Sequence, residues 1–220
     1  DRGGRLWSLM REGVSYRRGL NGRILEKSYD GDWLNRRCLA DAEAVRLVAS
    51  AADRVAVLRE QLRDPRLAPA GPESADLLMM LDQAARYDGA AHTRDCEDFA
   101  RVYDPVGILP PDQYMALVLQ ATEGCSFNTC TFCDFYRDRR FHIKSPDEFR
   151  SHARAVRAFL GDSLHLRRSI FLGEANALAA PTNRLAALMR IAREEIGAWP
   201  VYAFLDGLTG SKKTPEEYAL

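Results

Sequence analysis

The sequence predicts an α/β fold in its second half, preceded by a mostly helical N-terminal region. Three apolar runs in the second half each have the length of a buried strand, and each is followed by a polar loop and the start of a helix. In the first half, apolar residues recur at three- and four-residue steps, which is the spacing of helices. Pro105, Pro110 and Pro111 separate the two patterns. We therefore expect an N-terminal region over residues 1–110 and a second domain over residues 111–220.

The composition is that of an ordinary globular protein. Of 220 residues, 46% are hydrophobic and 28% are charged, and the 31 basic residues equal the 31 acidic ones. This balance gives no indication of a nucleic-acid or membrane partner. No apolar run has the length of a membrane span and no secretory signal opens the chain, so we expect a cytoplasmic protein. The five cysteines are odd in number and clustered, which argues against a disulfide framework.

The first half predicts two helices and one short strand. Residues 41–63 form a helix because their apolar side chains fall on one stripe, made by Val45, Val48, Ala52, Val55, Leu58 and Leu62. Residues 73–87 predict a second helix, and residues 96–103 a further helical turn. Residues 1–40 are rich in turn signals and contain one potential strand, over 23–29. No catalytic motif is recognised in this half.

The second half repeats the order strand, loop, helix three times. We expect strands over residues 115–121, 169–172 and 201–205. A capping box made by Ser145 and Glu148 starts the first helix, and the two later helices start beside prolines. Such units form parallel sheets, and right-handed crossovers place the carboxyl ends of all three strands at one edge.

The strongest chemical signal is the loop directly after the first of these strands. Cys125, Cys130 and Cys133 have the spacing C-x4-C-x2-C, and three thiolates this close together can converge on one metal centre. Glu174 follows the second strand and Asp206 follows the third. We expect all of them at the same edge of the sheet, where α/β folds bind their ligands.

Three kinds of metal centre compete for this loop. Structural zinc requires a fourth ligand, which His142 or Cys96 would supply. A plant-type [2Fe–2S] cluster has the same leading spacing but needs a cysteine downstream, and none follows Cys133. A [4Fe–4S] cluster held by three cysteines leaves its fourth iron open to a small molecule. This third centre accounts best for a three-ligand loop at a ligand-binding edge.

With this loop the sequence resembles the radical S-adenosylmethionine (SAM) superfamily. The usual motif of that family is C-x3-C-x2-C after the first strand, so this chain has one additional residue between its first two cysteines. An aromatic residue commonly precedes the third cysteine, as Phe132 does here, and a Gly-Gly-Glu motif commonly ends the second strand, where residues 172–174 read Leu-Gly-Glu. Residues 120–125 and 204–210 are similar to one poorly characterised branch. The resemblance covers residues 105–220.

The resemblance implies a radical SAM enzyme with two cofactors, a [4Fe–4S] cluster and SAM. Cys125, Cys130 and Cys133 would hold the cluster, and SAM would bind its open iron. Reductive cleavage of SAM would give a 5′-deoxyadenosyl radical that abstracts hydrogen from a substrate, which the sequence does not identify. An electron donor such as a flavodoxin or ferredoxin is an implied partner. The alternative is a non-catalytic iron–sulfur or zinc-binding module.

The resemblance also assigns a fold and further site residues. It implies a partial TIM-like (β/α) barrel, of which this chain would hold the first three βα units. Glu174 would bind the SAM ammonium group, Phe132 would lie near the adenine, and Asn176 and Asp206 would contact SAM or substrate. Because the chain stops in the middle of its third repeat, we expect a fragment that is poorly soluble or inactive alone.

One basic and aromatic segment, residues 136–144, follows the cysteines. We interpret it as a charged loop between a strand and a helix. Nucleic acid is not the expected partner, because no further basic patch in the sequence accompanies this one.

Overall fold

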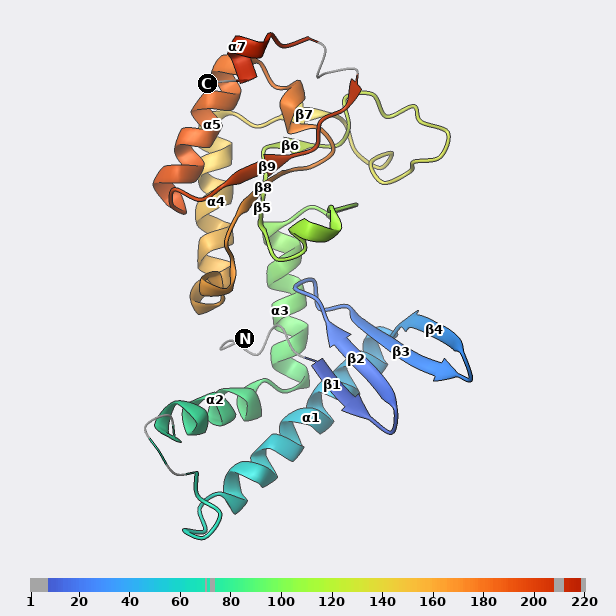
Figure 1. The fold of residues 1–220 in the computed structure, drawn as a ribbon, viewed down its shortest axis with the longest axis vertical. Helices are drawn as coiled ribbons and strands as arrows, with labels where there is room; N and C mark the ends of the chain where they lie inside the picture. The colour runs from blue at the N-terminus through green and yellow to red at the C-terminus, as the bar shows by residue number, and fades with distance from the viewer. Residues whose placement is uncertain (1–7, 70, 72–73, 208–211, 219–220) are drawn as a thin grey trace. The chain divides into compact units, whose positions relative to one another are not determined.

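The computed structural model describes residues 8–69, 71, 74–207 and 212–218. The described residues form a mixed α/β protein. It divides into two compact units, Asp1–Arg101 and Val102–Leu220 (Figure 1). Each unit has its own sheet and its own packed helices, so each is described by itself.

The first unit begins with an antiparallel sheet of four strands in the order β1-β2-β3-β4. The strands are β1 (Ser8–Arg11), β2 (Val14–Arg18), β3 (Ile24–Asp30) and β4 (Trp33–Cys38). Tight turns join β1 to β2 and β3 to β4. Gly13 and Gly31 take positive φ values of 78° and 57° in these turns, a conformation that glycine adopts without steric cost.

Three helices complete the first unit: α1 (Asp41–Gln61), α2 (Ser74–Arg86) and α3 (Gly89–Val102). Ile24 of β3 is fully buried against Ala44 and Val48 of α1, so one face of the sheet packs on this helix. The predicted apolar stripe is therefore confirmed at its N-terminal end. It is wrong near the C-terminal end, where Leu58 is 44% exposed.

The prediction of a mostly helical N-terminal region is wrong for residues 8–38, which form the sheet. Of the four strands, only β3 had a counterpart in the sequence analysis. The other three carry many polar and charged residues, because only one face of the sheet is packed and the turns leave little room for an apolar run. Of residues 96–103, expected to make one helical turn, residues 96–102 belong to the longer helix α3.

The second unit is built on a parallel sheet with the strand order β5-β8-β9. Its strands are β5 (Leu117–Gln120), β8 (Ile170–Gly173) and β9 (Val201–Ala203). All three expected strands and their parallel pairing are confirmed. The sheet of the described residues stays open and does not close into a barrel.

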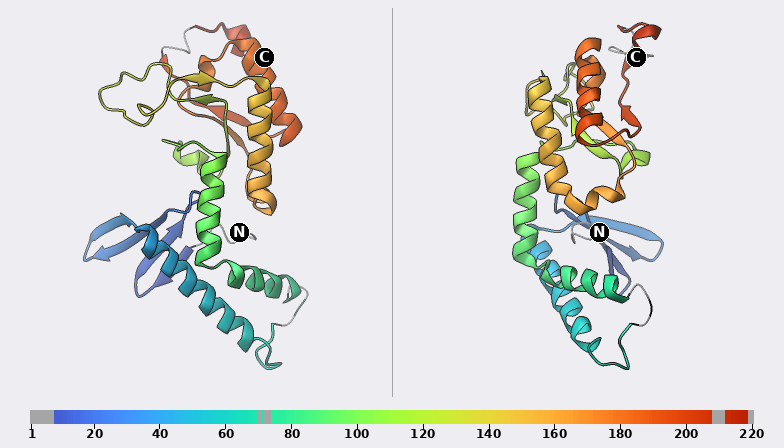
Figure 2. Two further views of the ribbon diagram at one scale, coloured as in Figure 1. Left: turned by 180° about the vertical axis from the view of Figure 1, so that it is seen from behind. Right: turned by 90° about the vertical axis from the view of Figure 1, so that its left-hand side faces the viewer.

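Two helices, α4 (Pro146–Leu160) and α5 (Thr182–Glu195), lie side by side on the sheet of the second unit (Figures 1 and 2). The capping box of α4 is confirmed, because the Glu148 amide donates to Ser145 Oγ at 3.2 Å and the Ser145 amide donates to Glu148 Oε2 at 2.6 Å. The predicted inner face of α4 is also confirmed, and its buried residues are Phe149, Ala153, Val156 and Leu160.

Short elements connect these parts of the second unit. Three 3-10 turns are η1 (Pro111–Gln113), η2 (Gly161–Leu166) and η3 (Ala177–Ala179), and one helical turn is α7 (Pro215–Tyr218). Just beyond β5, β6 (Thr122–Glu123) pairs antiparallel with β7 (His142–Ile143). The cysteine loop therefore leaves from one strand of this small ladder and returns through the other.

A buried histidine of α4 fixes the end of β5. The Gln120 amide donates to His152 Nε2 at 2.9 Å, and the His152 ring meets the Tyr103 ring edge-on at 5.6 Å between centroids. Burial, and next the positive charge of Lys144, lower the pKa of His152 to about 4. The imidazole is therefore neutral at pH 7 and accepts the strand's hydrogen bond.

This histidine should make stability depend on pH. The unfolded chain takes up a proton at His152 near pH 6.5, whereas the folded chain does so only near pH 4. The stabilisation is therefore complete above pH 6.5 and is lost as the pH falls through this window. We expect the free energy of unfolding in urea to fall by about 2 kcal/mol between pH 7 and pH 5 on account of this one group.

His152→Gln is the matched variant, because its amide oxygen can accept the Gln120 hydrogen bond but does not titrate. We expect it to flatten the pH dependence between pH 5 and pH 7 by about the same 2 kcal/mol. An unchanged slope in this variant would contradict the assignment.

Candidate functional site

Three of the predicted site residues, Glu174, Asn176 and Asp206, lie where the parallel strands end. Glu174 follows β8, and its Oε2 accepts a hydrogen bond from the Gly124 amide at 2.6 Å. Asn176 Nδ2 donates to Ser126 Oγ at 2.7 Å and to Asp206 Oδ2 at 3.1 Å. Loops after three different strands are thus joined at one edge, as the βα topology predicted.

Glu174 is the most buried carboxylate of this edge, with 4% of its surface exposed. Its amide donates to the Thr122 carbonyl oxygen at 3.2 Å, which extends the β-ladder and fixes the backbone below the carboxylate. Burial raises the pKa of Glu174, while the hydrogen bond from the Gly124 amide and the charge of Arg139 act in the opposite direction. The charged form of Glu174 is therefore favoured only while its hydrogen-bond donors and Arg139 stay in place.

Gln120, the last residue of β5, is a donor to Glu174 that the sequence analysis missed. Its Nε2 donates to Glu174 Oε1 at 2.8 Å and to the Asp104 carbonyl oxygen at 3.1 Å. Its Oε1 accepts from the Asp104 amide at 3.1 Å, so the buried side chain is satisfied on both sides. The sequence did offer one signal for this role: Gln120 is a polar residue at the end of an apolar strand, just before the cysteines.

Arg139 is the second residue that the sequence analysis missed. Its guanidinium donates to Glu174 Oε1 at 2.9 Å and to Asp138 Oδ1 at 3.0 Å. It also lies over the Tyr136 ring at 5.9 Å, and burial, followed by the charge of Glu174, raises the pKa of that phenol to about 12. Part of the segment interpreted as a charged loop therefore turns inward and neutralises the buried carboxylate.

The three cysteines of the loop are free thiols, and each is half-buried. Within the described part of the chain, no three His, Cys, Asp or Glu side chains form a group that could hold a metal ion. The structure thus places Cys125, Cys130 and Cys133 on one loop at the site but does not gather their sulfur atoms. Phe132, which precedes the third cysteine, is 91% exposed.

Side-chain hydrogen bonds shape the loop between the cysteines. Asn128 has a positive φ of 46° and donates through Nδ2 to the Tyr136 carbonyl oxygen at 2.9 Å. Arg137 donates to the Cys130 carbonyl oxygen at 2.7 Å. These bonds hold the loop backbone between Asn128 and Arg137.

The additional ligands considered for zinc have other contacts. His142 Nε2 lies 3.3 Å from Glu148 Oε2, at the capping box of α4. Cys96 belongs to the first unit, where its sulfur lies 3.8 Å from His92 Nε2.

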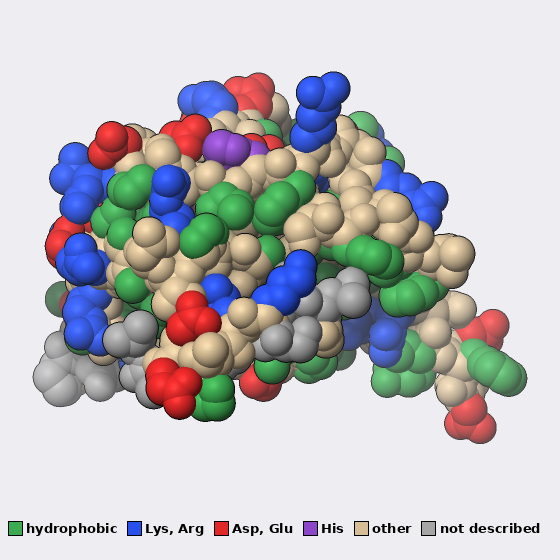
Figure 3. Space-filling view, turned by 90° about the horizontal axis from the view of Figure 1, so that it is seen from above, with side chains coloured by type: hydrophobic (Ala, Val, Ile, Leu, Met, Phe, Trp, Pro, Cys, Tyr) green, Lys and Arg blue, Asp and Glu red, His purple; other side chains and the backbone are tan. Residues whose placement is uncertain are grey.

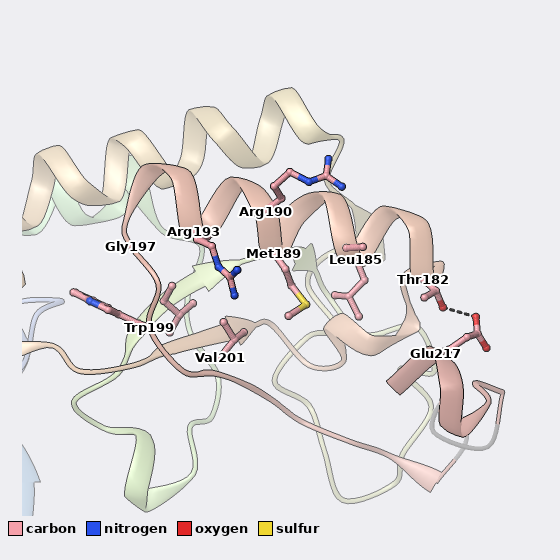
Figure 4. A pocket seen from close by; sticks show the side chains of 11 residues that line it. Thr182, Leu185, Met189, Arg190, Arg193, Gly197, Trp199, Val201 and Glu217 are labelled. Atoms are coloured by element: carbon pink, nitrogen blue, oxygen red, sulfur yellow. Dashed lines mark hydrogen bonds between the residues drawn. The ribbon is translucent and has the colours of Figure 1, made fainter. Parts of the chain in front are cut away.

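A groove of about 290 Å³ lies elsewhere on the second unit, between α5 and β9 (Figure 4). Leu185, Met189 and Val201 point into it, and a hydrogen bond of 2.5 Å from Thr182 Oγ1 to Glu217 Oε1 closes one end. None of the predicted site residues lines this groove. Arg190 and Arg193 line it together with apolar residues, but no cysteine does.

The surface gives little further indication of a partner for this site. On the face shown in Figure 3, lysine and arginine side chains lie among acidic and hydrophobic ones. None of the helices in the described ranges is both long and apolar enough to span a membrane.

Comparisons with known proteins add no relative. No family model, no curated protein and no solved structure matches the chain.

The ion pair between Arg139 and Glu174 predicts a large effect of one substitution. Arg139→Gln leaves a buried carboxylate without its cation, so we expect the free energy of unfolding to fall by about 3 kcal/mol. Hydrogen exchange at the Gly124 amide should become faster, because this amide bonds to the same carboxylate.

The control is Arg137→Gln, which removes an exposed arginine two residues away and should cost about 1 kcal/mol or less. The double variant Arg139→Gln with Glu174→Gln should recover part of the loss, because no buried charge remains. An Arg139→Gln variant as stable as the parent would contradict the role given to the pair.

Proposed function

We propose that this chain carries the cluster-binding part of a radical SAM enzyme. The observation that carries the proposal is the bond between Glu174, at the end of β8, and the Gly124 amide, directly before Cys125. A three-cysteine loop and a buried carboxylate from the next βα unit thus share one edge. The open sheet of three parallel strands supports, as a further proposal, the start of a partial TIM-like (β/α) barrel.

The donor set fits a three-thiolate cluster in its chemistry. Cys125, Cys130 and Cys133 are free and half-buried, and thiolates are the ligands that iron–sulfur clusters use. Their sulfur atoms do not form a ligand group in this structure, so cluster binding requires the loop to draw them together.

When bound, a reduced [4Fe–4S] cluster would supply the one electron that cleaves SAM into methionine and a 5′-deoxyadenosyl radical able to abstract hydrogen from a substrate. In this proposal the three cysteines hold the cluster, and Asn176 and Asp206 contact SAM or substrate beside it. The proposal keeps Phe132 near the adenine, which requires its exposed ring to turn toward the site.

Glu174 would bind the ammonium group of SAM. Its Oε1 already accepts a bond from the guanidinium of Arg139, so one cation occupies the position that the proposal gives to another. Arg139 would then move off Glu174 as the ammonium arrives, and Asp138 remains bonded to its Nε. The buried carboxylate keeps one positive partner throughout.

The partners that belong to this proposal are SAM, an unidentified substrate and an electron donor such as a flavodoxin or ferredoxin, in the cytoplasm. The alternative from a different class is a non-catalytic iron–sulfur or zinc-binding module. Retention of zinc alone would favour the zinc module, and iron uptake without SAM binding would favour the non-catalytic cluster.

Cluster assembly tests the first part of the proposal. After anaerobic reconstitution with ferrous iron and sulfide, we expect about four irons per chain and the absorption of an iron–sulfur cluster. Substitution of Cys125, Cys130 or Cys133 by Ala should each abolish that uptake. SAM should then bind more tightly to the reconstituted parent protein than to the protein without a cluster.

The matched control is Cys38→Ala, which removes an exposed cysteine of the first unit and should leave iron uptake unchanged. Equal loss of iron in Cys38→Ala and the loop variants would contradict the assignment. Tight zinc without iron would favour the alternative module.

SAM binding tests the role of Glu174. Glu174→Gln should weaken SAM affinity by about tenfold or more, because a buried charge-assisted contact is lost, while iron uptake is retained. The matched control is Glu148→Gln, which removes an exposed carboxylate at the α4 cap while its amide keeps the capping bond. Unchanged SAM affinity in Glu174→Gln, measured by equilibrium dialysis, would show that its role is misassigned.

A further inference from the structure

One face of the first unit's sheet packs on α1 around Ile24, although Trp33 at the end of the same face is 81% exposed. Side chains alternate between the faces of a strand, so Ile24, which is buried on α1, identifies the packed face. On the opposite face, Tyr29 is 70% exposed and Met10 is 68% exposed. We call this second surface the open face.

Three basic residues lie on the open face, one on each of three successive strands. In the strand register Lys27 is directly opposite Arg36, and Arg17 is opposite Leu25, two residues from Lys27. By the same alternation, Tyr29 and Leu34 form the next pair on this face. None of the described strand residues that point to the open face is acidic, and these residues are Ser8, Met10, Ser15, Arg17, Leu25, Lys27, Tyr29, Leu34, Arg36 and Cys38.

The pairing of Lys27 with Arg36 is unfavourable by itself. Like charges directly opposite each other on neighbouring strands destabilise a sheet. Among the described residues, neither side chain nor that of Arg17 has an ion pair or hydrogen bond with a carboxylate. The open face therefore has a concentration of positive charge that no carboxylate among the described residues neutralises.

The adjacent pair on the packed face shows the contrast. Arg37 lies opposite Glu26, bonds to its Oε1 at 2.7 Å, and reaches Glu43 of α1 at 2.9 Å. One step along the same two strands, the charges are thus balanced on one face and of a single sign on the other.

We propose that the open face binds single-stranded nucleic acid. Arg17, Lys27 and Arg36 would contact successive phosphates, and the exposed ring of Tyr29 would stack on a base. The inference rests on the first unit alone and is independent of the function proposed for the cysteine loop.

The spacing of the side chains fits this occupant. Directly opposite Cβ atoms lie about 5 Å apart, and diagonal neighbours such as Arg17 and Lys27 about 7 to 8 Å apart, so long basic side chains can follow one phosphate backbone. Tyr29 stands two residues from Lys27 along β3, at about 7 Å. A base next to a bound phosphate could therefore reach the ring.

The combination of charge and aromatic surface favours a single strand over other polyanions. An acidic protein segment would use the three cations but has no base to stack on Tyr29. Duplex bases are paired and stacked on each other, so they do not offer their faces to a side chain. Basic side chains combined with an exposed aromatic ring are the arrangement that binds single strands with little sequence preference.

The test measures fluorescence anisotropy of a labelled RNA of mixed sequence, about 12 nucleotides long, with all 220 residues of the chain present and over a range of salt concentrations. The triple variant Arg17→Gln, Lys27→Gln, Arg36→Gln should bind at least about tenfold more weakly at low salt. The slope of log affinity against log salt should become shallower by about 2. Tyr29→Ala should weaken binding by about fivefold or more and leave the slope unchanged.

The matched control is the triple variant Arg54→Gln, Arg86→Gln, Arg94→Gln, which removes the same charge from exposed helical positions of the first unit. It should retain the affinity of the parent, and thermal melts followed by circular dichroism should show that all variants fold.

Three outcomes would overturn the proposal. Equal loss in the two triple variants, or no binding at low salt, would show that the open face is not a site. A duplex of the same sequence that binds as tightly would exclude stacking on Tyr29. A polyglutamate peptide that binds as tightly as the RNA, with no effect of Tyr29→Ala, would identify an acidic protein partner instead.

Discussion

The buried carboxylate of Glu174 is the constraint on which the site edge depends. A carboxylate withdrawn from water is tolerated only when hydrogen-bond donors and a cation replace the lost solvent. The Gly124 amide, Gln120 and Arg139 supply these at distances of 2.6 to 2.9 Å. The donors come from residues 120–124 and from Arg139, on the two sides of the cysteine loop, so the charge of Glu174 ties both ends of this loop to the end of β8.

The fold was predictable wherever burial was complete. Apolar patterns predicted the strands β5 and β8 and the inner face of α4, because these parts are buried from water. The sheet over residues 8–38 was not predictable in the same way. Its packed face carries Arg18, Glu26 and Arg37, so charged residues interrupt the apolar–polar alternation by which a half-buried strand is recognised.

The candidate site was predictable in its location and not in its contacts. Parallel strands bring their carboxyl ends to one edge whatever their side chains, so Glu174, Asn176 and Asp206 could be placed together from chain order alone. Gln120 and Arg139 become partners of Glu174 only through tertiary packing, and their sequence positions identify no such pairing. Whether three thiols converge depends on the conformation of their loop. The C-x4-C-x2-C spacing permits convergence but does not determine it.

An exchange of cations at Glu174 would have a small electrostatic cost. Loss of Arg139 alone would leave a charge that is buried and unpaired, whereas arrival of an ammonium group as the guanidinium departs keeps the number of charges constant. The Arg139 guanidinium would also keep a partner, because its Nε lies 3.0 Å from Oδ1 of Asp138. Asp138 is largely exposed, so it could follow the guanidinium. Selectivity at this edge would then depend on what else the incoming molecule contacts. Asn176, which already links Ser126 to Asp206, is the neighbouring polar group best placed to contribute to that choice.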